Sequence, residues 1–215
     1  MSPENIGLLP FVLTAFVTLF VVVDPPGLVP VFVSLTAGRE DAYRRYAMRR
    51  ALSVGFAVAL FFLVAGRWLL TYLGVSMPAF SISGGILLFC IAFQMLFGHR
   101  AGLQSSEEEL TSDEAGDIAI FPLAIPLISG PGTLTTLLTL AASAHNSPIR
   151  ESVVAIALAV VFAITGLFLR FGTSLMQRLG HGGVQVLTRV FGLLLAALAI
   201  QFVLGGISGF SHSWR

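Results

Sequence analysis

The sequence is short of charge, of lysine and of cysteine. Only 11% of its 215 residues are charged, against about 25% in a soluble domain. All twelve basic residues are arginine and eleven acids nearly balance them, which leaves no basic surface for a nucleic acid. The single cysteine, Cys90, excludes a disulfide or a sulfur-ligated metal within the chain, and we expect its side chain to be buried. Apolar residues make up 56% and mean hydropathy is +0.91, so lipid must cover much of the surface.

Long apolar runs organise the chain. Each run reaches or nearly reaches the roughly 20 residues that a helix needs to cross a bilayer, and none alternates as the strands of a β-barrel do. The six predicted spans are Leu8–Leu35, Ala51–Leu73, Ala79–Phe97, Ile118–Ala144, Val153–Leu169 and Val184–Ile207. The sequence therefore predicts an all-α polytopic membrane protein.

The arginines predict its orientation. Nine of the twelve fall on the side of the first, third and fifth links, which places those links in the cytoplasm and both termini outside. The third link is rich in acids (Glu107, Glu108, Glu109, Asp113, Glu114 and Asp117). Acids contribute little to the orientation rule. We expect a solvated connector there, with docking of a partner as the alternative.

The two halves of the chain resemble each other. At an offset of 105 residues, Asp24-Pro25-Pro26-Gly27 aligns with Ser129-Gly130-Pro131-Gly132, and further glycine, leucine and glutamine matches follow at offsets of 106 and 107. We expect one membrane domain with repeat one at 1–98, an acidic cytoplasmic loop at 99–117 and repeat two at 118–215. Three spans is an odd number, so the second repeat would be inverted, as in many secondary transporters. A duplication retained only for packing is the alternative.

Proline and glycine break the first and fourth spans at matching positions. Pro25 and Pro26 lack the N–H of a continuous helix, and Pro131 does the same in span four. Asp24 and Ser129 occupy the expected N-cap positions. Amides after each break suit an anion and carbonyls before it suit a cation, so the two breaks together match a zwitterion such as an amino acid.

Asp24 is the only carboxylate inside a predicted span. A charge at that depth points to function, as a partner for a substrate ammonium, as a proton carrier or as a cation ligand. The alternative is a helix cap alone. The predicted binding set is Asp24, Pro25, Pro26, Gly27, Ser129, Gly130, Pro131, Gly132, Thr133, Gln94 and Gln201.

Residues farther from the breaks carry weaker expectations. Thr133 is included because it is the threonine of its span nearest the break, although such hydroxyls often bond their own helix. Gln94 and Gln201 could line a cavity or bond between helices. Close helix packing is expected at Gly84, Gly85, Gly192, Gly205 and Gly206. No catalytic residue, metal site or cofactor is predicted.

The two break motifs resemble those of the MarC family of bacterial and archaeal inner-membrane proteins. The first reads Asp-Pro-Pro-Gly-Leu-Val-Pro from Asp24, with Leu28 where the family commonly has Asn. The second reads Pro-Leu-Ile-Ser-Gly-Pro-Gly from Pro126 to Gly132. The resemblance covers nearly the whole chain. It implies a six-span protein related to LysE-type exporters, some of whose relatives are assigned to transport of small neutral amino acids.

We therefore expect a secondary transporter of small neutral amino acids in the inner membrane, coupled to protons or sodium, whose partners are a small-molecule substrate and the lipid bilayer. The alternative is a passive channel or exporter for a small polar solute. An enzyme is not expected, because the sequence has no carboxylate pair, metalloprotease motif or serine with a base at its depth. The remaining hypothesis is a scaffold or sensor that docks a partner through the acidic loop.

Overall fold

The computed structural model describes residues 7–36, 38–97, 124, 128–144 and 147–213. The predicted acidic loop at 99–117 and most of the first half of the predicted fourth span lie outside these residues. The elements are α1 (Leu8–Val23), α2 (Pro25–Leu35), α3 (Asp41–Tyr72), α4 (Met77–Phe97), α5 (Pro131–Ser143), α6 (Pro148–Arg170) and α7 (Gly172–Ser213). No strand occurs within the described ranges.

Five helices in the described residues are long and apolar enough to cross a membrane. They comprise 8–33, α3, α4, α6 and the part of α7 from Gln185 to Phe210. Large apolar side chains cover the outside, among them Val64, Trp68 and Tyr72, which are 79%, 71% and 78% exposed. Such a surface is compatible with lipid and not with water. The expected polytopic α-helical membrane protein is confirmed at this level.

Helix α3 is longer than the apolar run that predicted it. The run begins at Ala51, whereas the helix begins at Asp41 and includes an arginine-rich first third. The negative charge of Asp41 in the first turn interacts favourably with the helix dipole. Its carboxylate oxygen lies 4.0 Å from a guanidinium nitrogen of Arg44. Apolar content marks only the part of a helix that lipid covers, so the polar extension was not predicted.

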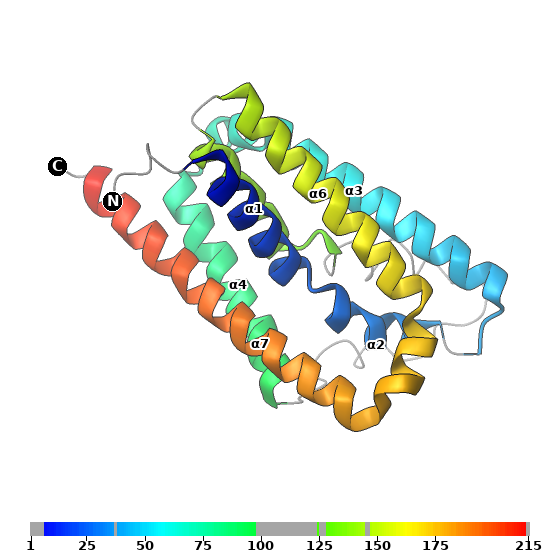
Figure 1. Ribbon diagram of the computed structural model, residues 1–215. Coiled ribbons are helices and arrows are strands. Elements are labelled where there is room, and N and C mark those ends of the chain that lie inside the picture. Colours follow the sequence, from blue (N-terminus) through cyan, green and yellow to red (C-terminus); the bar gives the residue numbers. More distant parts are fainter. Residues whose placement is uncertain (1–6, 37, 98–123, 125–127, 145–146, 214–215) are drawn as a thin grey trace.

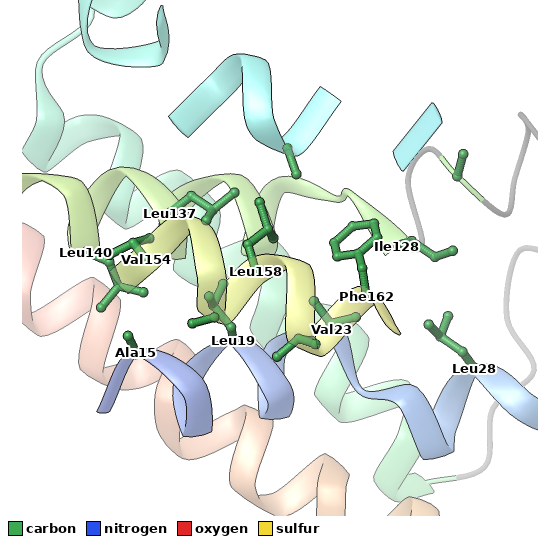
Figure 2. Close-up of a cluster of buried hydrophobic side chains, with 14 of the residues drawn as sticks. Ala15, Leu19, Val23, Leu28, Ile128, Leu137, Leu140, Val154, Leu158 and Phe162 are labelled. Carbon is green, nitrogen blue, oxygen red and sulfur yellow. The ribbon is translucent and has the colours of Figure 1, made fainter. Parts of the chain in front are cut away.

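The core lies between α1, α5 and α6. Figure 2 shows side chains from these helices meeting in one cluster, including Leu19 of α1, Leu137 of α5 and Leu158 of α6, all 0% exposed. The same cluster continues past the end of α1 to Leu28 of α2 and Ile128. Both breaks are therefore anchored to one core.

Helices α4 and α7 form an antiparallel pair (Figure 1). Gly85 lies against the Ala199 carbonyl, and Gly206, farther along α7, lies against the carbonyl of Pro78 near the start of α4. The absence of side chains lets the backbones approach, which confirms the packing expected at four of the five glycines. Gly205 is the exception, because nothing lies within 4 Å of the position its Cβ would take.

Candidate functional site

Asp24 lies between α1 and α2, at the position of the first predicted break. Helix α1 ends at Val23, Asp24 has left-handed φ and ψ of 50° and 63°, and α2 begins at Pro25. It is the only non-glycine residue with positive φ in the described chain. Its side chain is 8% exposed, and the Gly27 N–H donates to its Oδ1 at 3.1 Å. The expected N-cap is confirmed. Within the described residues no hydrogen bond reaches the second carboxylate oxygen, Oδ2.

The end of α1 is rich in oxygen acceptors. In a continuous helix the carbonyls of Val21 and Val22 would accept from residues 25 and 26, which are prolines without an N–H. The carbonyl of Val23 would accept from Gly27, whose N–H donates to Asp24 instead. Three carbonyls thus lose their helical donors beside the carboxylate of Asp24. This combination suits an ammonium group or a small cation.

The side chain of Asp24 leaves room only for glycine at position 27. A Cβ at this position would collide with the carboxylate of Asp24. The side chain of Asp24 therefore folds back over the first turn of α2, where Pro25 and Pro26 are buried. Leu28, which follows this turn, is also buried and belongs to the hydrophobic core.

The start of α5, where the second break is predicted, is capped differently. Helix α5 begins at Pro131, and its N-cap is Gly130, in an extended conformation with no side-chain cap bond. The expectation that Ser129 caps the helix is wrong, because it stands one residue before the N-cap. Its hydroxyl donates instead to the carbonyl of Gly55 in α3, at 2.6 Å. Within the described ranges no side chain caps the positive end of the α5 dipole, whereas Asp24 fills that role for α2.

The threonines of α5 do not behave alike. Thr133 donates to the Ile128 carbonyl at 3.0 Å, so its hydroxyl is used in holding the break. The hydroxyls of Thr135, Thr136 and Thr139 are buried and have no hydrogen-bond partner in the described part of the chain. Choosing Thr133 by its closeness to the break missed these three. The signal that could have found them is their spacing, which places them on one face of the helix.

One residue of α4 connects the two breaks. Leu88 is 2% exposed and packs in a cluster with Val22, which is two residues before Asp24. The same side chain fills the space left by Gly132 in the first turn of α5. The acceptor-rich end of α1 and the uncapped start of α5 are thus joined through Leu88 in the protein interior.

Two predicted residues lie elsewhere. Gln94 and Gln201 are both exposed, on α4 and α7, so the structure does not bring them to the buried breaks. The prediction of a buried Cys90 is wrong, because it is exposed. Cys90 stands two residues from Leu88 and Ala92, which face inward, and a shift of two positions turns a side chain to the far side of a helix.

Comparison with known proteins identifies the family. The sequence model of the MarC family integral membrane proteins matches residues 9–211. A UPF0056 membrane protein of Archaeoglobus fulgidus is 35% identical over 94% of each chain. The UPF0056 membrane protein YvbG of Bacillus subtilis is 35% identical over 93% of this chain and 95% of its own.

A further relative is named as an inner membrane protein. The UPF0056 inner membrane protein YhgN of Escherichia coli K12 is 37% identical over 91% of this chain and 95% of its own. No solved structure matches the chain significantly. Since the family match extends over nearly the whole sequence and agrees with both break motifs, this chain belongs to the MarC family of integral membrane proteins.

Proposed function

We propose that the chain is a secondary transporter of small neutral amino acids, with the substrate held between the two breaks. The ammonium group would bind at the end of α1, beside Asp24 and the carbonyls of Val21 and Val22. The carboxylate would bind at the uncapped start of α5, near Gly132. The observation that supports the proposal most strongly is the buried Asp24, whose Oδ2 accepts no hydrogen bond from any described residue. It lies next to backbone carbonyls that have lost their helical donors, and an ionisable group at this depth in a membrane protein points to function.

The proposed architecture is six spans in two inverted repeats, with the fourth span formed by residues 118–144. Contacts related by the sequence offsets support it. Gly85 of α4 lies against Ala199 and Val203 of α7. At the offset of 107, the equivalent of Gly85 is Gly192, and the equivalents of Ala199 and Val203 are Ala92 and Leu96. Gly192 does lie against Ala92 and Leu96. A pseudo-two-fold axis between α4 and α7 accounts for both sets.

Two further pairs repeat at the neighbouring offsets. Gly66 of α3 packs against Leu138 of α5, and its equivalent Gly172 packs against Val33 of α2. Gly74 and Gly180, offset by 106, both have positive φ, of 69° and 64°. The matching left-handed glycines, one after α3 and one at a kink inside α7, and the equivalent contacts favour duplication of a structural unit over chance similarity.

The arginine distribution supports placing both termini outside the cell, and the name of the Escherichia coli relative supports the inner membrane. Arg39 and the arginines at the start of α3 belong to the link that would face the cytoplasm. The anionic inner leaflet would attract that surface.

Counterflow in proteoliposomes tests the function. Proteoliposomes that contain the purified protein are loaded with one unlabelled amino acid of a panel at a time. Uptake of the same amino acid in radiolabelled form is then measured with and without pH and sodium gradients. We expect exchange of at least one small neutral amino acid. The proposal is wrong if none exchanges.

The matched variant is Asp24→Asn, which keeps an oxygen for the cap and removes only the charge. Exchange is expected to fall by more than about tenfold, the loss of one charge-assisted bond. Unchanged exchange, without any response to the gradients, would identify the passive channel or exporter instead.

A further inference from the structure

Helix α5 carries three hydroxyl groups that have no hydrogen-bond partner among the residues that the structure describes. Thr135 and Thr136 are 0% exposed, and the hydroxyl oxygens of both, and of Thr139, are buried with no hydrogen bond. A buried hydroxyl without a partner is unfavourable, and native proteins rarely keep one without a reason. Three on one membrane helix require an explanation.

Other threonines of the chain avoid this state by bonding their own helix. Thr36 donates to the Phe32 carbonyl, Thr71 to Arg67 and the fully buried Thr165 to Val161, at 2.8, 2.9 and 2.8 Å. This back-bonding is open to a threonine in any helix. The hydroxyls at 135, 136 and 139 make no such bond to the α5 backbone, and that of Thr135 lies against Gly84 of α4 instead.

The three residues form one stripe that starts at the break. Gly132, Thr135, Thr136 and Thr139 stand at i, i+3, i+4 and i+7, the spacing of a single helix face. The stripe is about 10 Å long at the rise of an α-helix. It runs from the proposed carboxylate site in the first turn of α5 toward Ala144, the residue that follows the helix.

Helix α4 covers this stripe. Leu88 fills the space at Gly132, and one turn earlier on α4, Gly84 lies directly against the hydroxyl of Thr135. These two contacts show that α4 runs antiparallel to α5 over the part of the stripe from Gly132 to Thr135. Its small residue at Gly84 leaves room for a hydroxyl but offers no side-chain partner.

We propose that Thr135, Thr136 and Thr139 line a polar access path for the substrate, between the break at Gly130 and the Ala144 end of α5, which α4 closes in this structure. The inference rests on the proposed transport function. Hydroxyls suit such a path because each both donates and accepts, and so can exchange bonds with water, an ammonium or a carboxylate in turn. Separation of α4 from α5 would open it, as rocking of one helix group does in transporters with repeats.

The stripe is only partly repeated in the first half of the chain. At the offset of 105 that relates the two breaks, Thr135 and Thr136 correspond to Pro30 and Val31 of α2, neither of which has a side-chain donor, whereas Thr139 corresponds to Ser34, which has a hydroxyl. The stripe therefore is not simply a product of duplication. By the arginine distribution, its far end faces the outside of the cell.

Cysteine accessibility tests the path without any need for a known substrate. Thr135, Thr136 and Thr139 are replaced by Cys one at a time in a Cys90→Ala background, and modification by a small water-soluble methanethiosulfonate is measured in membranes. Leu137→Cys and Leu138→Cys are the controls, since both positions are 0% exposed on other faces of the same helix. We expect modification of the stripe to be at least about tenfold faster, as water reaches only that face. Equal rates at all five positions would overturn the proposal.

Isosteric substitution provides a second test. Thr135→Val and Thr136→Val each remove a hydroxyl without changing the shape of the side chain. Each is expected to slow counterflow by about tenfold, which corresponds to the loss of one hydrogen bond. Thr→Ser at the same positions keeps the hydroxyl and should retain exchange. Thr165→Val is the control and should leave exchange unchanged. Val variants with full exchange would contradict the path.

The two proposals can fail separately. If the stripe cysteines react faster but no amino acid exchanges, the path stands and the amino-acid function is wrong. If amino acids exchange while the stripe reacts no faster than Cys at 137 and 138, the function stands and the path is wrong.

Discussion

The hydroxyl of Ser129 donates a hydrogen bond of 2.6 Å to the carbonyl of Gly55, a residue 74 positions away on α3. Both ends of this bond are buried. The approach depends on glycine, because a Cβ at Gly55 would lie 3.2 Å from the Ser129 oxygen. The bond fixes the second break against the middle of α3 and so positions the start of α5.

We predict that Ser129→Ala destabilises the protein by about 1 kcal/mol, the typical net value of one hydrogen bond. Unfolding in mixed micelles with increasing denaturing detergent measures the change. Ser152→Ala is the control, because that hydroxyl bonds the Pro148 carbonyl at 2.8 Å on the exposed surface of α6. The assignment fails if the two variants lose equal stability.

Two substitutions at Asp24 should separate its structural role from its charge. Asp24→Ala removes the bond to the Gly27 N–H and should cost about 0.5–2 kcal/mol of stability. Asp24→Asn keeps an acceptor and tolerates the left-handed conformation, so its stability should stay within about 0.5 kcal/mol of the parent. Equal destabilisation by both variants in the same unfolding assay would mean that the charge itself holds the fold.

Gly27→Ala should destabilise by about 1–3 kcal/mol, as overpacking does, because the new Cβ would collide with the carboxylate of Asp24. Removing the carboxylate should relieve the collision. In the Asp24→Gly background, whose glycine also fits the positive φ, Gly27→Ala should cost far less. A double-mutant cycle measures the coupling, and additive effects would contradict the contact.

The sequence was sufficient to predict the break at Asp24 because its cause is local. Two consecutive prolines remove N–H groups whatever surrounds them, and an Asp before them caps the next helix. Helix α1 ends at Val23 and α2 begins at Pro25, next to these residues. Membrane insertion was equally predictable, since it follows from composition alone.

Partners from distant segments were not predictable. Ser129 and Thr133 have similar hydroxyls close to one break, but one bonds α3 and the other its own chain. The choice depends on which carbonyl the tertiary fold brings near. The exposure of Cys90 and Gln94 likewise depends on where α7 packs against α4, which apolar content does not reveal because both the lipid-facing and the buried sides of such a helix are apolar.

Gly84→Ala changes the contact between α4 and the threonine stripe of α5. A Cβ at Gly84 would collide with the hydroxyl of Thr135, so either α4 shifts away from α5 or the threonine leaves its rotamer. We expect a loss of about 1–3 kcal/mol in the unfolding assay, relieved in the Thr135→Ala background. Gly205→Ala is the matched control, because it also stands in a membrane helix but has nothing within 4 Å of its Cβ position. There the better helix propensity of Ala should leave stability equal or slightly higher. Equal effects of the two substitutions would show that helix propensity, and not the contact with Thr135, decides the response at Gly84.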